Sequence, residues 1–388
     1  MTDHAPGCPE QQLQLHCASA DAVDGDRARN LAQKGLAWDA LAEAAEYHGL
    51  APILYHTLDS ACPELIPENV ARRLHDCYRD SAKRNVLLTA RLFALLDAFE
   101  AKSIAVVPLK GPLLAELLYP DPVLRPFSDL DLLIGEHDVP GALDLLEQEG
   151  YRLALHLARL PLRSLRRLGG ELILRSDSGG QVDLKWETAP FDYPFRFDVQ
   201  VLWRSLRPGR IAGREVAALA PDCLMLFLCV HGTKHMWSRL QWLGDVARLA
   251  QTGPHWNAVM ALAAETCCER PVLLGLLLAH DLLDAPVPDD IQERARADRA
   301  VVSHARIVAE RLYRAEPYEP SSIQLTAFNA SLAEHSWHKV RHYAALLKAP
   351  TEAELEVITM PSQLFFLYYP LRAVRMLWKY FARLGSKR

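Results

Sequence analysis

The sequence predicts an α+β fold in which a small mixed β-sheet is flanked by N-terminal and C-terminal helical regions. Between residues 28 and 100, apolar residues recur every three or four positions, as they do on one face of a helix. Between residues 104 and 186, short β-branched or alternating runs replace that period, which is typical of strands. The helical period returns after Pro221 and continues almost to the end of the sequence.

Length and composition favour several packed regions over one core. The chain has 388 residues, of which 50% are hydrophobic and 23% are charged. A chain of this length usually divides into more than one domain. We expect five regions: a loose polar tail over 1–25, an N-terminal helical region over 26–100, a sheet core over 101–190, a C-terminal helical domain over 191–350, and a basic aromatic helix over 351–388.

Charge and cysteine content narrow the range of partners and compartments. The net charge of -5 gives no general attraction to nucleic acid, so no DNA partner is expected. The eight cysteines form no C-x-x-C pair, the N-terminus lacks an apolar signal segment, and no apolar run reaches the ~18 residues of a membrane span. These features predict a cytoplasmic protein. Residues 361–388 carry six basic and no acidic residues, so this amphipathic helix is expected to pack on the protein or to touch a membrane surface weakly.

The core region alternates strands and helices. The run 104–109 reads as a strand that ends at the turn Lys110-Gly111, and Pro112 suits the first turn of a following helix. Residues 128–134 alternate polar and apolar side chains and then become apolar, as in a strand with one open end. A helix is expected over 138–150. Two further strands, 172–175 and 181–186, flank a glycine-containing hairpin turn.

Three aspartates on the predicted strands carry the chemistry. Asp129 and Asp131 are two residues apart, which places both carboxylates on one face of a strand. Carboxylates held so close repel each other unless a cation neutralises them, and Mg²⁺ prefers such ligands together with phosphate oxygens. Asp183 lies between two apolar residues on another strand and would join the pair if the strands are adjacent. Three carboxylates predict a site for two Mg²⁺ ions, which could support displacement at a phosphorus atom.

Basic residues around these strands are candidates for binding phosphate. The turn Lys110-Gly111 precedes a helix, whose free N–H groups and dipole favour an anion. Lys110 would add a positive charge at this turn. Arg125 would add a guanidinium that can donate two hydrogen bonds to a phosphate group of a bound triphosphate. The alternatives are a solvated turn lysine and a structural ion pair of Arg125.

A polar stripe interrupts the helix predicted after Pro221. The stripe contains His231, Lys234, His235 and Ser238, which fall on one helical face. Lys234 and His235 are expected to contact phosphate or an acceptor; zinc binding by the two histidines lacks a visible third ligand. A buried, hydrogen-bonded histidine pair is the structural alternative.

Five short segments together resemble the uncharacterised nucleotidyltransferase family of the polymerase-beta-like superfamily. The segments are Leu109-Lys110-Gly111, Leu117-Leu118-Tyr119-Pro120, Leu124-Arg125-Pro126, Ser128-Asp129-Leu130-Asp131-Leu132-Leu133 and Val182-Asp183-Leu184-Lys185-Trp186. The resemblance extends over about residues 30–345. The superfamily's usual turn is Gly-Gly or Gly-Ser shortly before the acids, whereas Gly111 stands 18 positions before Asp129.

The resemblance implies transfer of a nucleoside monophosphate from an NTP, with ATP expected, to a hydroxyl of a small molecule, peptide or protein. Asp129 and Asp131 match the family's paired acids, and Asp183 matches the third. The residues expected to bind the nucleotide are Lys110, Gly111, Arg125, Ser128, Lys234 and His235. Two alternatives stay open: an inactive nucleotide-binding or scaffold protein with the same fold, and a metal-dependent phosphohydrolase.

Overall fold

The chain divides into two compact units, each built from separate stretches of sequence. The computed structural model describes residues 7–19, 25–153, 170–177, 179–189, 193–312 and 319–337, and the isolated positions 339, 340, 342, 367, 370, 371, 374 and 375. The helical unit comprises the described residues of Met1–Arg91, Leu109–Ser128 and Val201–Glu334. The sheet unit comprises those of Leu92–Pro108 and Asp129–Gln200, with the described positions beyond Glu334.

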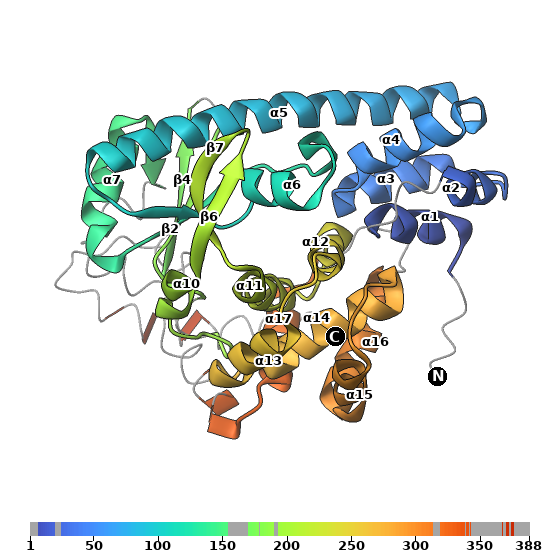
Figure 1. The fold of residues 1–388 in the computed structure, drawn as a ribbon. Coiled ribbons are helices and arrows are strands. Elements are labelled where there is room, and N and C mark those ends of the chain that lie inside the picture. The colour runs from blue at the N-terminus through green and yellow to red at the C-terminus, as the bar shows by residue number, and fades with distance from the viewer. Residues whose placement is uncertain are drawn as a thin grey trace. The chain divides into compact units, whose positions relative to one another are not determined.

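Helices make up most of the helical unit (Figure 1). Those before the sheet strands are α1 (Pro9–Ala18), α2 (Gly25–Ala32), α3 (Trp38–His48), α4 (Ala51–Ala61), the short η1 (Pro63–Leu65), the first part of α5 (Glu68–Ala101), α6 (Pro112–Leu118) and the short η2 (Pro122–Leu124). Those after them are α10 (Gln200–Arg204), α11 (Pro221–Lys234), α12 (Leu240–Gln251), α13 (Trp256–Glu265), α14 (Glu269–Leu283), α15 (Asp289–Ala297), α16 (Arg299–Leu312) and α17 (Ser322–Leu332). Helix α14 packs against α11, α12 and α16.

A five-stranded mixed sheet forms the sheet unit. Its strands are β1 (Val106–Pro108), β2 (Leu130–Ile134), β3 (Tyr151–Leu153), β4 (Glu171–Ser176) and β5 (Gln181–Lys185), in the order β1-β2-β5-β4-β3. Strands β2 and β5 run parallel, and the other neighbouring pairs are antiparallel. The short η3 (Glu136–Asp138) leads into helix α7 (Val139–Gln148), which packs on β3. The α+β class with a small mixed sheet and helical flanks is confirmed.

Successive side chains of a strand alternate, so the sheet has one apolar face and a second face, here called the polar face, which carries polar side chains together with Leu133 and Ile173. Leu130 and Leu132 of β2 and Val182 and Leu184 of β5 are at most 1% exposed. The intervening positions on these strands include two of the three predicted acids, Asp131 and Asp183. The hairpin between β4 and β5 also forms as expected, and Gly179 in its turn has a φ of 86°, which a residue with a Cβ rarely adopts.

Two elements differ from the sequence-based expectation. Helix α1 lies within the stretch 1–25, predicted as a loose tail, and it forms because Leu13 and Cys17, one turn apart, are fully buried. A hairpin of β6 (Leu206–Ile211) and β7 (Arg214–Leu219) stands in the region 191–350, predicted as helical. Its two-residue turn, Ala212-Gly213, has positive φ at both positions, as a tight hairpin requires.

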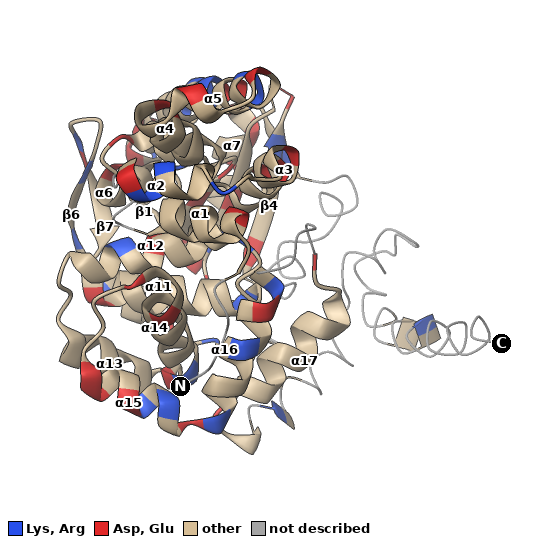
Figure 2. Ribbon diagram, turned by 90° about the vertical axis from the view of Figure 1, so that its right-hand side faces the viewer, with Lys and Arg blue, Asp and Glu red and all other residues tan. Residues whose placement is uncertain are grey.

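The distribution of charged and apolar residues in the described helices fits the sequence-based expectations of a small net charge and no membrane span. Acidic and basic residues are interleaved in the sequence of α5 rather than segregated, and Figure 2, which looks at the end of this helix, shows both colours there. Among the described residues, no helix combines the length and the apolar character needed to cross a membrane. The predicted helix over 351–388, with its expected membrane contact, lies outside the described residues apart from isolated positions.

Candidate active site

Asp131 and Asp183 are direct neighbours in the sheet. Their Cα atoms are register partners in the parallel ladder between β2 and β5. Since paired residues of adjacent strands point to the same side of a sheet, both carboxylates lie on the polar face, opposite Leu130 and Leu132. Asp131 is 3% exposed, and Asp183 accepts a hydrogen bond from Gln181 Nε2 at 2.9 Å. The sheet therefore brings together two acids that are more than fifty positions apart in sequence.

Lys185 joins this pair, a contact that the sequence analysis missed. Its Nζ lies 3.4 Å from Asp131 Oδ1 and 3.9 Å from Asp183 Oδ2. The same ammonium donates a 2.6 Å hydrogen bond to Glu171 Oε2 on β4, where Glu171 is the register partner of Lys185. The alternation of a strand supplies the signal that could have revealed it, because Lys185 stands two positions after Asp183 and shares its face.

Burial and charge perturb the acids and the lysine together. Burial raises the pKa of Asp183, Lys185 lowers it, and Asp131 raises it further, so that the pKa lies above its ordinary value. Burial alone would lower the pKa of Lys185, but Glu171, Asp131 and Asp183 raise it well above its usual range. Lys185 is therefore a firmly charged ammonium between carboxylates at neutral pH.

The donor set suits a magnesium ion that also holds a substrate. Mg²⁺ commonly takes one or two carboxylates and completes its octahedron with phosphate oxygens and water. Asp131 and Asp183 could supply those carboxylates. Within the described ranges, no group of three or more His, Cys, Asp or Glu residues is arranged to hold a metal by itself. Asp129 is half-buried and lies just before β2 rather than within it.

Arg125 lies in the helical unit and pairs with Asp245 of α12. Its Nε and Nη2 donate to the two oxygens of Asp245 at 2.9 and 2.8 Å, and the two side chains are 5% and 1% exposed. The Tyr119 hydroxyl donates to Asp245 Oδ1 at 2.9 Å, and the pKa of Tyr119 is raised by burial and by the Asp245 charge. Of the two interpretations of Arg125, these contacts support the structural ion pair.

The turn before α6 has the shape that its glycine permits. Gly111 has φ 58° and ψ -121° and directly precedes Pro112, the first residue of the seven-residue helix. Lys110 Nζ lies 3.4 Å from His231 Nε2 within the helical unit. Ser128, the last residue of that unit before the acids, is exposed.

The polar stripe after Pro221 is shorter than predicted. Helix α11 ends at Lys234, His235 caps it, and the next two residues, Met236 and Trp237, have φ of 51° and 52°. Ser238 therefore lies beyond the helix. The rings of His231 and His235 are 4.9 Å apart, and each lies about 5 Å from Trp242 of α12, at 5.2 and 5.3 Å. The histidines thus form a half-buried aromatic cluster with Trp242.

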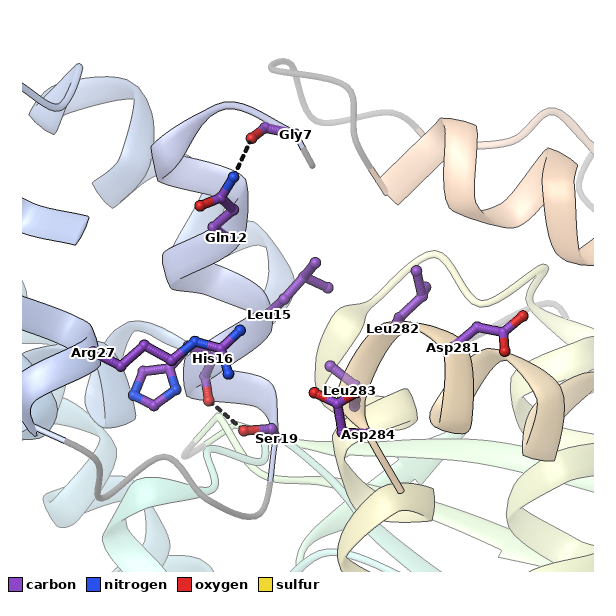
Figure 3. A pocket seen from close by; sticks show the side chains of 10 residues that line it. All are labelled: Gly7, Gln12, Leu15, His16, Ser19, Arg27, Asp281, Leu282, Leu283 and Asp284. Carbon is purple, nitrogen blue, oxygen red and sulfur yellow. Dashed lines mark hydrogen bonds between the residues drawn. The ribbon is translucent and has the colours of Figure 1, made fainter. Parts of the chain in front are cut away.

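A cavity of about 310 Å³ lies elsewhere in the helical unit, between α1 and α14 (Figure 3). His16 and Arg27 line one side, and Asp281 and Asp284 line the other. Its described lining includes none of the residues predicted to bind nucleotide or metal.

A sequence model described as "uncharacterised nucleotidyltransferase" matches residues 34–284, which is well over half of the chain. The chain belongs to the uncharacterised nucleotidyltransferase family. The matched range contains Asp129, Asp131, Asp183 and Lys185.

Two further comparisons add little to this family assignment. The chain is similar to a solved structure of an antigenic nucleotidyltransferase-like protein from Paracoccidioides brasiliensis, at 15% identity and a TM-score of 0.28. That match covers 53% of this chain and 93% of the other. A comparison with curated proteins gave no match.

Proposed function

We propose that this member of the nucleotidyltransferase family is a Mg²⁺-dependent enzyme. It transfers a nucleoside monophosphate from an NTP, with ATP expected, to a hydroxyl of a small molecule, peptide or protein. The observation that supports the proposal is the pairing of Asp131 with Asp183 on the polar face of the sheet. Bound Mg²⁺ would neutralise the triphosphate and stabilise displacement at its α-phosphorus. In that displacement the acceptor oxygen bonds to phosphorus, the bond to the β-phosphate bridge breaks, and pyrophosphate leaves.

The carboxylates have separate tasks in this proposal. Asp129 and Asp131 would hold Mg²⁺, with two ions expected. Asp183 would bind Mg²⁺ as well and would help to remove the hydroxyl proton of the acceptor. Lys110, Gly111, Arg125, Ser128, Lys234 and His235 remain proposed contacts for phosphate or acceptor, and Arg125 also pairs with Asp245.

The direct test is release of pyrophosphate from labelled NTPs in the presence of Mg²⁺. We expect Asp131→Asn and Asp131→Ala to abolish release, and Asp144→Ala, which removes an exposed acid of α7 in the same unit, to leave it unchanged. The thermal midpoint of each variant separates lost chemistry from lost folding. Equal release by the wild type and a folded Asp131 variant would reject the proposal.

One observation favours the second candidate, a nucleotide-binding or scaffold protein without turnover. The Lys185 ammonium already neutralises part of the carboxylate charge, 3.4 Å from Asp131. Calorimetry distinguishes the two candidates: binding of Mg-NTP without transfer to a broad set of hydroxyl acceptors would support the scaffold.

A further inference from the structure

Lys185 occupies the centre of the carboxylate cluster rather than its edge. Its nearest acid is Glu171, at 2.6 Å, and the contacts to Asp131 and Asp183 are longer, at 3.4 and 3.9 Å. The lysine side chain is 13% exposed and the Asp131 side chain 2%, so both charges are largely removed from water. Carboxylates buried in this way need a nearby positive charge.

A divalent cation would compete with this ammonium for the same oxygens. Mg²⁺ binds carboxylate oxygen at ~2.1 Å. An ion bound to Asp131 Oδ1 would therefore lie within roughly 5.5 Å of Nζ in its present position, since Nζ is 3.4 Å from that oxygen. Two positive charges so close repel each other in a poorly solvated site. The long, flexible lysine stem allows Nζ to leave the aspartates while it keeps Glu171.

We propose that Lys185 is a built-in counter-ion for Asp131 and Asp183, which a divalent cation must displace. This inference rests on the proposed metal site. Glu171 on β4 keeps its contact with the displaced ammonium. The phosphates of a bound nucleotide would attract the same ammonium and so favour its displacement from the aspartates. The site therefore binds the cation weakly alone and more tightly together with a nucleoside triphosphate.

Manganese retention by the full chain tests this role without measuring activity. We would measure by ultrafiltration how much Mn²⁺ the protein retains, with and without a non-hydrolysable ATP analogue. Lys185→Met should bind Mn²⁺ alone about tenfold more tightly than the wild type, a change of about 1.4 kcal/mol. Glu171→Gln should act in the opposite direction, because the aspartates are then the negatively charged partners that Lys185 keeps in this cluster. Lys102→Met, which removes an exposed lysine of the same unit, is the matched control and should leave retention unchanged.

The possible results separate this role from the metal site itself. Equal Mn²⁺ affinity in the wild type and a folded Lys185→Met variant overturns the counter-ion role, while the metal site stands. Should Lys185→Met fail to fold, Glu171→Gln decides, and an unchanged or tighter affinity there overturns the role. Absence of retained Mn²⁺ in every variant, with and without nucleotide, refutes the carboxylate site and the proposed function with it.

Discussion

Neutralising Asp245 should destabilise the helical unit strongly. In Asp245→Asn, the amide keeps one acceptor for Arg125 Nε and Tyr119, but it presents an NH₂ group to the guanidinium nitrogen that now donates to Oδ2 at 2.8 Å. The Arg125 side chain, 5% exposed, is then a buried charge without a counter-charge from Asp245. Removing one partner of a buried ion pair costs about 3–5 kcal/mol.

Urea unfolding followed by far-UV circular dichroism measures this loss. With a slope of about 1–3 kcal/mol per molar urea, the midpoint of the transition that reports the helical unit should fall by at least about 1 M. The double variant Arg125→Met/Asp245→Leu removes both charges of the pair and should lose less stability than Asp245→Asn, since neither charge is left buried without the other. An Asp245→Asn variant within about 1 kcal/mol of the wild type would refute this reasoning. Weaker NTP binding by an equally stable Arg125→Lys would instead assign Arg125 to the nucleotide.

Two other perturbations test local features. Burial lowers the pKa of His48 from 6.5 to about 4, so the unfolded chain takes up the proton first as the pH falls. The contribution of His48 to the free energy of unfolding should therefore be complete above pH 6.5 and should fall by up to about 3 kcal/mol towards pH 4. His48→Asn should reduce this dependence of stability on pH. An equal pH dependence in the variant and the wild type would contradict the prediction. Gly111→Ala places a Cβ on a residue with φ 58° and ψ -121° and should lower the free energy of unfolding by about 1–3 kcal/mol. The measurement is a lower thermal midpoint. An unchanged midpoint would show that the backbone of the turn adjusts without strain.

The core of the fold could be predicted because its signals are local. Leucines that alternate with acids in residues 128–134 indicate a two-faced strand, and the glycine at 179 indicates the hairpin. The sequence did not predict whether Asp183 lies next to Asp131, because the parallel pairing of β2 with β5 depends on long-range contacts. The hairpin β6–β7 was missed because its turn, Ala212-Gly213, is not one of the Asn-Gly, Asp-Gly or Gly-Gly pairs that signal a two-residue hairpin.

Other features depend on packing that no local pattern reveals. Helix α11 ends where Trp237 turns back with φ 52°, and this fully buried ring lies so close to Gly232 and Gly275 that a Cβ at either would lie within 3.0 Å of it. Neither glycine is adjacent to the turn in sequence. Likewise, the partnership of Arg125 with Asp245 joins residues 120 positions apart.

The ladder between β2 and β5 makes the spacing of the two aspartates insensitive to the length of chain between them. Residues added between β3 and β4 would leave Asp131 and Asp183 on the same rung, so related proteins could vary there without losing the pair. A deletion of one residue inside β5 has the opposite effect, because it would turn every following side chain to the other face and move Asp183 or Lys185 among the leucines. Natural variation in chain length should therefore be tolerated between the strands and excluded within them.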